Sequence, residues 1–299
     1  MNLYKYKVYE NDLKFKNKRE IDPTRAKWDN NVKDKYYNND LDTLEYRLNE
    51  CENNNFVYLD LSHLDLLILP KSQLLKWSHV NKLKYIKYLF INDNKLVKID
   101  NTFDIFNNLE VLDISNNNLS DILYLPLYLK ELSCHNNILN NIPFHKYLHR
   151  LDCSLNKIYE LSQYPNIKTI LCYDNNITKL YTYPNATTII CRNNNIININ
   201  PQPCLTYLDC SHTKLTGSLY DMPNINHLVC NNTKINNIDN LNKLKILDIA
   251  NSDITAIPYI HTLKNLSISI SDLKQIILSP TYVIANYNTE HNNVYIKFT

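Results

Sequence analysis

Apolar residues recur at regular intervals along most of the chain. From Leu132 to Leu266, a pair of apolar residues two positions apart recurs every 19 or 20 residues. In an extended segment, this alternation places the apolar side chains on one face and their neighbours on the other. One such segment cannot bury its apolar face alone, so the repetition predicts a stack of short extended units around a shared core.

The motif within each repeat is L-x-x-L-x-L-x-x-N-x-L, as in the segment from Leu129 to Leu139. Its fourth position, which we use as the marker of a repeat, holds Leu59, Leu89, Leu112, Leu132, Leu151, Ile170, Ile189, Leu208, Leu228, Leu247 and Leu266. This motif resembles that of the leucine-rich repeat family, and about eleven repeats cover residues 56–276. The prolines five positions before the marker are similar to those in the short repeats of bacterial and giant-virus proteins; they are Pro165, Pro184, Pro203 and Pro223.

The resemblance implies an α/β-type repeat solenoid that is mostly β, with a parallel concave sheet, an extended or turn-like convex side and few helices. Only about eight residues separate successive motifs, which leaves no room for a helix of usual length and predicts a shallow arc. The first repeat is longer, and its segment from Lys71 to Lys82 has the apolar spacing of a helix.

The ends of the array need caps, because a stack exposes its core at the first and last turns. Residues 1–55 are expected to form a polar leader and an N-terminal cap helix over residues 41–49, where Leu41, Leu44 and Leu48 have helical spacing. Residues 277–299 are expected to form a C-terminal cap, with strands near Tyr282 and Val294 joined in a hairpin.

Two positions of the motif are expected to form ladders along the stack. The ninth position holds an asparagine that can donate and accept at once and so bridge neighbouring turns; the residues are Asn94, Asn117, Asn137, Asn156, Asn175 and Asn194. Farther along, threonine or serine takes this position, which predicts weaker bracing. The inward sixth position holds Cys134, Cys153, Cys172, Cys191, Cys210 and Cys230. We interpret these as buried apolar side chains, since neighbouring parallel strands suit disulfides poorly and C-x-x-C pairs are missing from the sequence.

Composition narrows the possible functions. The single glycine argues against a dinucleotide or P-loop fingerprint, and a net charge of +2 provides no strong field for nucleic acid or anionic lipid. The sequence shows neither a secretory h-region nor a long apolar run, so no membrane association is expected. The cysteine ladder favours a reducing, cytoplasmic compartment. No catalytic motif, cofactor site or metal site is predicted.

The outward positions of the strands offer a continuous concave surface, and we expect the chain to be a non-enzymatic scaffold that binds a protein partner there. The candidate contact residues are Phe90, Arg150, Leu171, Tyr173, Ile190, Arg192, Tyr207, Asp209, His227 and Val229. Two alternatives stay open: a substrate-recognition adaptor for a ubiquitin ligase, recruited through residues 1–55, and a self-assembling structural component of the kind found in virions. A functionless explanation also stays open, in which the outward aliphatic residues are present only because strands favour such side chains.

Overall fold

The structure is a computed structural model that describes residues 43–99, 101–219, 221–273, 276–279, 281, 283–290 and 293–298. The chain divides into two compact units, Met1–Arg47 and Leu48–Thr299, and the repeats lie in the second. The predicted leader over residues 1–40 lies outside the described residues.

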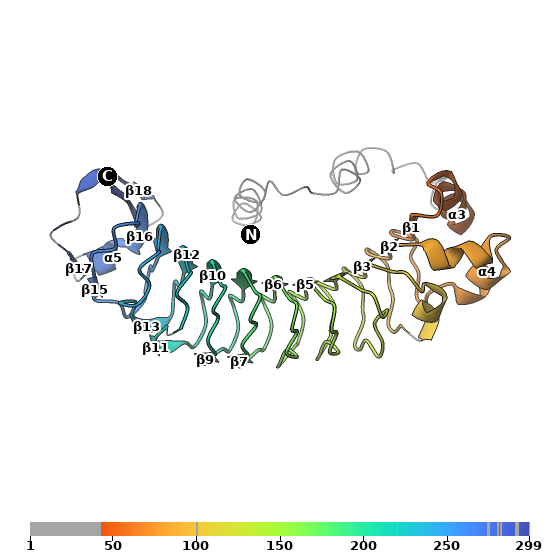
Figure 1. Ribbon diagram of the computed structural model, residues 1–299, viewed down its shortest axis with the longest axis horizontal. Helices are drawn as coiled ribbons and strands as arrows, with labels where there is room; N and C mark the ends of the chain where they lie inside the picture. The colour runs from red at the N-terminus through yellow and green to blue at the C-terminus, as the bar shows by residue number, and fades with distance from the viewer. Residues whose placement is uncertain are drawn as a thin grey trace. The chain divides into compact units, whose positions relative to one another are not determined.

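A 13-stranded sheet runs through the second unit, and the predicted parallel solenoid is confirmed (Figure 1). Its first eleven strands are parallel and each contains one marker residue; they are β1 (Tyr58–Asp60), β2 (Tyr88–Phe90), β3 (Val111–Asp113), β4 (Glu131–Ser133), β5 (Arg150–Asp152), β6 (Thr169–Leu171), β8 (Thr188–Ile190), β10 (Tyr207–Asp209), β12 (His227–Val229), β14 (Ile246–Asp248) and β16 (Asn265–Ser269). Marker pairs with marker from each strand to the next, for example Leu208 with Leu228. This register keeps every motif position in one row along the array.

The core lies behind this sheet, because the marker and the sixth position point inward. Ile170 and Cys172 are completely buried, and the same two positions of the neighbouring turns are equally buried. Hydrophobic burial along the whole stack therefore provides the main stabilisation, as expected for units that share their core with their neighbours.

The chain leaves each strand through one strained position, four residues after the marker. Its φ angle is +52° to +56° in ten successive repeats, at His63, Asp93, Asn116, Asn136, Leu155, Asp174, Asn193, His212, Asn232 and Asn251. Asparagine and aspartate tolerate this left-handed conformation best among residues with a side chain, which explains their frequency here. Leu155 is the one aliphatic residue in the series.

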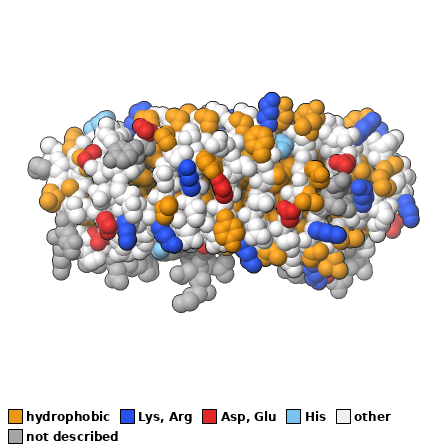
Figure 2. Space-filling view, turned by 90° about the horizontal axis from the view of Figure 1, so that it is seen from below, with side chains coloured by type: hydrophobic (Ala, Val, Ile, Leu, Met, Phe, Trp, Pro, Cys, Tyr) orange, Lys and Arg blue, Asp and Glu red, His pale blue; other side chains and the backbone are white. Residues whose placement is uncertain are grey.

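The convex side is extended or turn-like, as predicted, and its strands form three short parallel pairs (Figure 1). They are β7 (Lys179–Leu180) with β9 (Asn198–Ile199), β11 (Thr216–Ser218) with β13 (Lys234–Asn237), and β15 (Ala256–Ile257) with β17 (Ile277–Leu278). Figure 2 shows this side, where apolar side chains are interspersed with charged ones.

Helices are few among the described residues: α3 (Leu44–Asn53), α4 (Lys71–Lys76), α5 (Ile270–Leu273) and two 3-10 helices, η1 (Val80–Tyr85) and η2 (Asn101–Ile105). The helix predicted around residues 71–82 forms only over Lys71–Lys76, because the backbone becomes extended at Trp77 and a separate 3-10 helix follows from Val80. The ring of Trp77 instead packs near Phe56 and His79, at 5.9 and 5.6 Å between centroids. At the other end, β18 (Ile284–Glu290) and β19 (Asn293–Phe298) form an antiparallel hairpin that pairs with β16.

Candidate functional site on the concave face

Asparagine side chains brace the turns that end the concave strands. Asn175 accepts a hydrogen bond from the backbone N–H of Ile158 in the preceding repeat at 2.9 Å and donates to the carbonyl of Cys153 at 3.0 Å. It also donates to the carbonyls of Cys172 and Tyr173 in its own repeat, both at 3.2 Å. A buried amide that serves two turns holds them at a fixed separation. The strands, and the side chains they carry, therefore form a rigid platform.

The later repeats are braced differently. Thr213 and Thr233 stand where earlier repeats have asparagine, and each donates a hydrogen bond of 2.7 Å to a carbonyl of its own repeat. A hydroxyl has one proton to donate, so it cannot reproduce the pattern of an amide. The two threonines follow β10 and β12, so the strands that carry part of the candidate surface are the ones that lack the asparagine bracing.

The cysteine row contributes packing rather than chemistry. All eight cysteines are free, and the six of the row are buried. Burial raises the pKa of the Cys153 thiol well above its usual range, and the same holds for its neighbours in the row. A thiol without thiolate character is a poor nucleophile and a poor metal ligand.

The centre of the concave surface is a row formed by the fifth motif position. Leu171, Ile190, Asp209 and Val229 lie next to one another in register on β6, β8, β10 and β12. The expectation that Ile190 and Val229 are exposed aliphatic residues is wrong, since each is only 3% exposed. The fifth position ends each strand and lies between the outward third and seventh positions of its own repeat, beside the fifth positions of the neighbouring strands, and these neighbours cover it. This row is therefore the floor of the surface, and contact must come from the flanking positions.

A fixed aromatic and charged cluster stands beside this floor. The Arg192 guanidinium carbon lies 4.1 Å from the centroid of the Tyr173 ring, and its Nη1 lies 3.5 Å from Oδ2 of Asp209. The Arg192 side chain is 17% exposed, whereas Asp209 is buried. Cation–π and ionic contacts on two sides of one guanidinium restrict its rotamers, so the group is pre-organised.

The remaining candidates lie at different distances from the Arg192 cluster. Tyr207 and His227 form an edge-to-face ring contact with centroids 4.5 Å apart, on β10, which also carries Asp209, and on β12. Arg150 lies on β5, beside β6. Phe90 lies on β2, and β3, β4 and β5 separate it from β6. The structure thus brings together the candidates from Arg150 to Val229 and leaves Phe90 apart.

The sequence also contains a local signal that explains the aspartates of the floor. In the pattern D-x-S, Oδ1 of the aspartate accepts hydrogen bonds from the backbone N–H of the serine two residues on, as Asp209 does from Ser211 at 3.1 Å. Asp60, Asp113 and Asp152 make the same bond to Ser62, Ser115 and Ser154. These short-range bonds close the end of the strand. Asp209 therefore has a structural role at the end of its strand, independent of any contact with a partner.

One grouping on this face has the residue types of a hydrolase but not the geometry. Ser133 Oγ lies 3.1 Å from Nδ1 of His135, and Asp152 Oδ2 lies 3.8 Å from the same nitrogen. In a catalytic triad, the serine and the carboxylate contact different nitrogens of the imidazole. Within the described part of the chain, histidine, cysteine and carboxylate side chains form no group suited to hold a metal ion.

Comparison with known proteins identifies the architecture. No protein-family profile matches the chain, and no curated protein matches it in sequence. The crystal structure of the leucine-rich repeat domain of APL1B is similar, with a TM-score of 0.61 and 21% sequence identity over 78% of this chain and 77% of that chain. This chain has the leucine-rich repeat fold. YopM from Yersinia pestis, a leucine-rich effector protein, gives a TM-score of 0.59 at 19% identity over 74% of this chain and 73% of that chain.

A third similar structure is that of the LRIM1/APL1C complex, with a TM-score of 0.59 and 20% identity. The match covers 78% of this chain and 49% of that chain, about half of its length. At such identities the likeness concerns the fold alone. The longest described helix, α3, has 10 residues, about half of what a bilayer-spanning helix needs.

Proposed function

We propose that this leucine-rich repeat chain is a non-enzymatic scaffold that binds a protein partner through its concave face. The observation that carries the proposal is the Tyr173, Arg192 and Asp209 cluster, in which a guanidinium is held between an aromatic ring at 4.1 Å and a carboxylate at 3.5 Å. Tyrosine and arginine dominate the energetic centres of protein interfaces. A side chain that is already fixed loses little entropy on binding, so its contacts contribute more to affinity.

The surroundings of the cluster support this role. The floor at Leu171 and Ile190 is rigid because Asn175 and Asn194 cross-link their turns to the preceding ones. The ring pair of Tyr207 and His227 adds aromatic area two strands away from Tyr173. The similar LRIM1/APL1C structure is that of a complex, so this fold is compatible with association. The eight free cysteines support a reducing compartment.

The test compares three purified forms of the full chain as bait for a cytosolic extract: the wild type, Tyr173→Ala/Arg192→Ala, and Lys179→Ala/Tyr181→Ala. The last is a matched control, because Lys179 Nζ lies 5.1 Å from the Tyr181 ring and β7 belongs to the convex side. A protein retained by the wild type and the control, and lost from the concave variant, supports the proposal. Its affinity for the concave variant should fall about thirtyfold or more, as loss of about 2 kcal/mol predicts.

Other outcomes favour the alternatives. A protein retained equally by all three forms would contradict binding at the concave cluster. Retention of ligase subunits would favour the adaptor function, and retention of further copies of the same chain would favour self-assembly. Circular dichroism of each variant establishes that the fold is intact, which is expected because the substituted side chains lie on the surface of the sheet.

A further inference from the structure

A second surface feature lies along the side of the sheet at which the strands β2 to β5 begin. It is a groove of about 430 Å³, which we call the flank groove. Its lining residues come from four consecutive turns and stand two and four positions before each marker, so none of them belongs to the concave cluster. The groove has the volume of many ligand sites.

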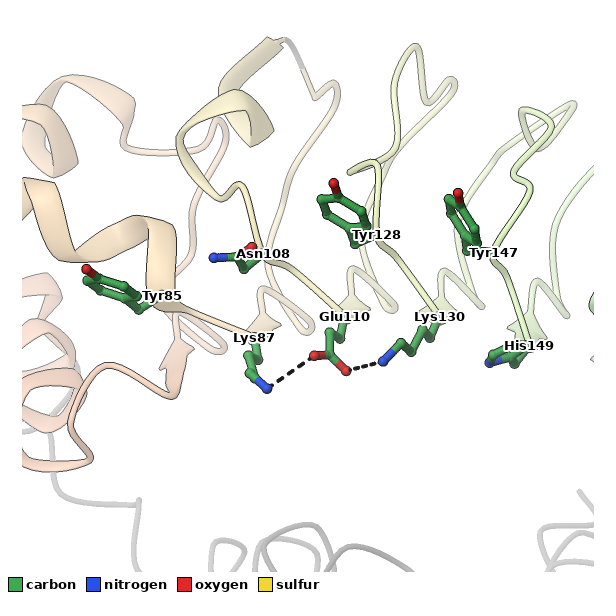
Figure 3. Close-up of a pocket in the computed structure, with 8 residues that line it drawn as sticks. All are labelled: Tyr85, Lys87, Asn108, Glu110, Tyr128, Lys130, Tyr147 and His149. Carbon is green, nitrogen blue, oxygen red and sulfur yellow. Dashed lines mark hydrogen bonds and ion pairs between the residues drawn. The ribbon is translucent and has the colours of Figure 1, made fainter.

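Three tyrosines form one wall of the flank groove. Tyr85, Tyr128 and Tyr147 are 51%, 51% and 40% exposed. The rings of Tyr128 and Tyr147 lie side by side, with centroids 6.5 Å apart and planes at 29° (Figure 3). Lys84 Nζ lies 5.1 Å from the Tyr85 ring, and Lys146 Nζ lies 5.4 Å from the Tyr147 ring. Exposed aromatic faces next to ammonium groups provide both apolar contact and positive charge.

The opposite wall carries charge in a fixed arrangement. Glu110 lies between Lys87 and Lys130, with N–O distances of 3.3 and 2.7 Å (Figure 3). The hydrogen bond from Lys130 is the main cause that lowers the pKa of Glu110, so this carboxylate stays ionised. Two ammonium groups share one carboxylate, which leaves one positive charge unneutralised at the centre of the groove.

His149 ends this wall without adding charge at neutral pH. Burial lowers the pKa of its imidazole, and Lys168 and Lys130 lower it further, against the opposite effect of Glu131. The groove therefore offers a modest positive potential, with the lysines of the tyrosine wall at its rim.

We propose that the flank groove binds an acidic, extended segment of a protein partner in which apolar side chains alternate with carboxylates. The apolar side chains would contact the rings of Tyr128 and Tyr147, while the carboxylates would compete with Glu110 for Lys87 and Lys130. In an extended segment these two kinds of side chain point to opposite sides, as the two walls require.

The charge distribution distinguishes this occupant from others. A nucleic acid brings a continuous row of phosphates and binds through many unpaired cations, whereas Glu110 stands at the centre of this groove. Residues 1–42 of the chain itself contain more lysine and arginine than aspartate and glutamate, so they lack the complementary charge. A short acidic segment needs only the one or two cationic contacts that the groove provides.

The experiment selects ligands from a phage-displayed library of random short peptides, with the intact chain as bait. Selection is counter-screened against Lys87→Ser/Lys130→Ser, whose side chains are half exposed and not needed for the core. The best peptide is then titrated by fluorescence anisotropy against the wild type, Lys87→Ser/Lys130→Ser, Tyr128→Ser/Tyr147→Ser and the convex control Lys179→Ser/Tyr181→Ser. We expect selected peptides rich in aspartate and glutamate with interspersed apolar residues, and a loss of affinity of about tenfold or more in both groove variants.

Each alternative outcome overturns the inference. Peptides without an excess of acidic residues, or no enrichment above the counter-screen, would refute it, as would equal binding to the wild type and both groove variants. Displacement of the peptide by a single-stranded oligonucleotide at lower concentration than by unlabelled peptide would assign the groove to nucleic acid instead. The concave variant Tyr173→Ala/Arg192→Ala should bind the peptide like the wild type, so this result is independent of the proposed concave function.

Discussion

The asparagine ladder makes a quantitative prediction at Asn175. In Asn175→Ala, the carbonyls of Cys153, Cys172 and Tyr173 each keep another donor, from Asn156, Asn194 and the backbone of Leu155. The buried N–H of Ile158, however, has Asn175 as its acceptor, so the substitution leaves this group unpaired. An unpaired buried donor costs about 1 to 3 kcal/mol, and the cavity and the three lost donor contacts add to it. We expect a loss of about 2 to 4 kcal/mol in the free energy of unfolding.

Two further variants separate the sources of this loss. Asn175→Thr imitates Thr213, whose hydroxyl bonds within its own repeat, so it fills the space but leaves the Ile158 N–H unpaired. Its cost should be smaller than that of Asn175→Ala yet clearly measurable. The neighbouring Asn176→Ala removes a half-exposed side chain and should change stability by less than about 0.5 kcal/mol.

The assay is urea unfolding followed by circular dichroism, with amide hydrogen exchange to locate the change. Exchange should accelerate first at the amide of Ile158 and in the adjacent turns. If Asn175→Ala cost less than about 1 kcal/mol, or no more than Asn176→Ala, the ladder would not brace neighbouring turns, and the reasoning that makes the concave face rigid would fail with it.

Three more measurements test the core and its charges. Native chain should react with a thiol reagent at Cys204 alone, and at all eight cysteines in denaturant, because Cys204 is exposed and the others are buried; rapid labelling of a second native thiol would contradict the buried row. Cys172→Asp should lower stability by several kcal/mol more than Cys172→Ala, because it buries a charge; equal urea midpoints would place this position outside the core. Burial raises the pKa of Asp248 above 3.8, so its stabilising contribution, present at low pH, is lost as the pH rises through the raised value. Asp248→Asn should therefore gain stability relative to wild type between acidic pH and pH 7, and parallel urea-midpoint profiles would refute this.

The sequence predicted those parts of the fold that depend on local alternation. Each marker such as Ile170 is followed two residues later by Cys172 or an equivalent, and this spacing alone orients both side chains inward. The parallel sheet and the helix-poor convex side follow from a repeat too short for a long helix. The helix predicted over Lys71 to Lys82 is correct only as far as Lys76, because the same spacing also suits a short helix followed by an extended residue, and ring contacts to Phe56 hold Trp77.

Features that depend on neighbouring repeats were not predictable from one motif. Ile190 is buried because Leu171 and Asp209 stand beside it in register, and nothing in its own repeat shows this. The flank groove likewise needs four turns in register before Tyr128 and Tyr147 meet. A different signal was present and could have been used: the D-x-S pattern assigns Asp209 to the strand end. Leu155 shows the opposite case, since its left-handed backbone is set by the array and not by its own preference.

The same register links the two proposed sites. Each motif position forms a row along the array, with one residue per strand about 4.8 Å from the next. The concave cluster lies in the rows at and just after the ends of the strands, and Lys87 and Lys130 lie in the row just before the strands begin. The two sites also occupy different turns, the groove at β2 to β5 and the cluster of Tyr173 and Arg192 just after β6 and β8. A partner that extended along the array could therefore contact both without a bend in the scaffold, and its avidity would exceed that of either contact alone.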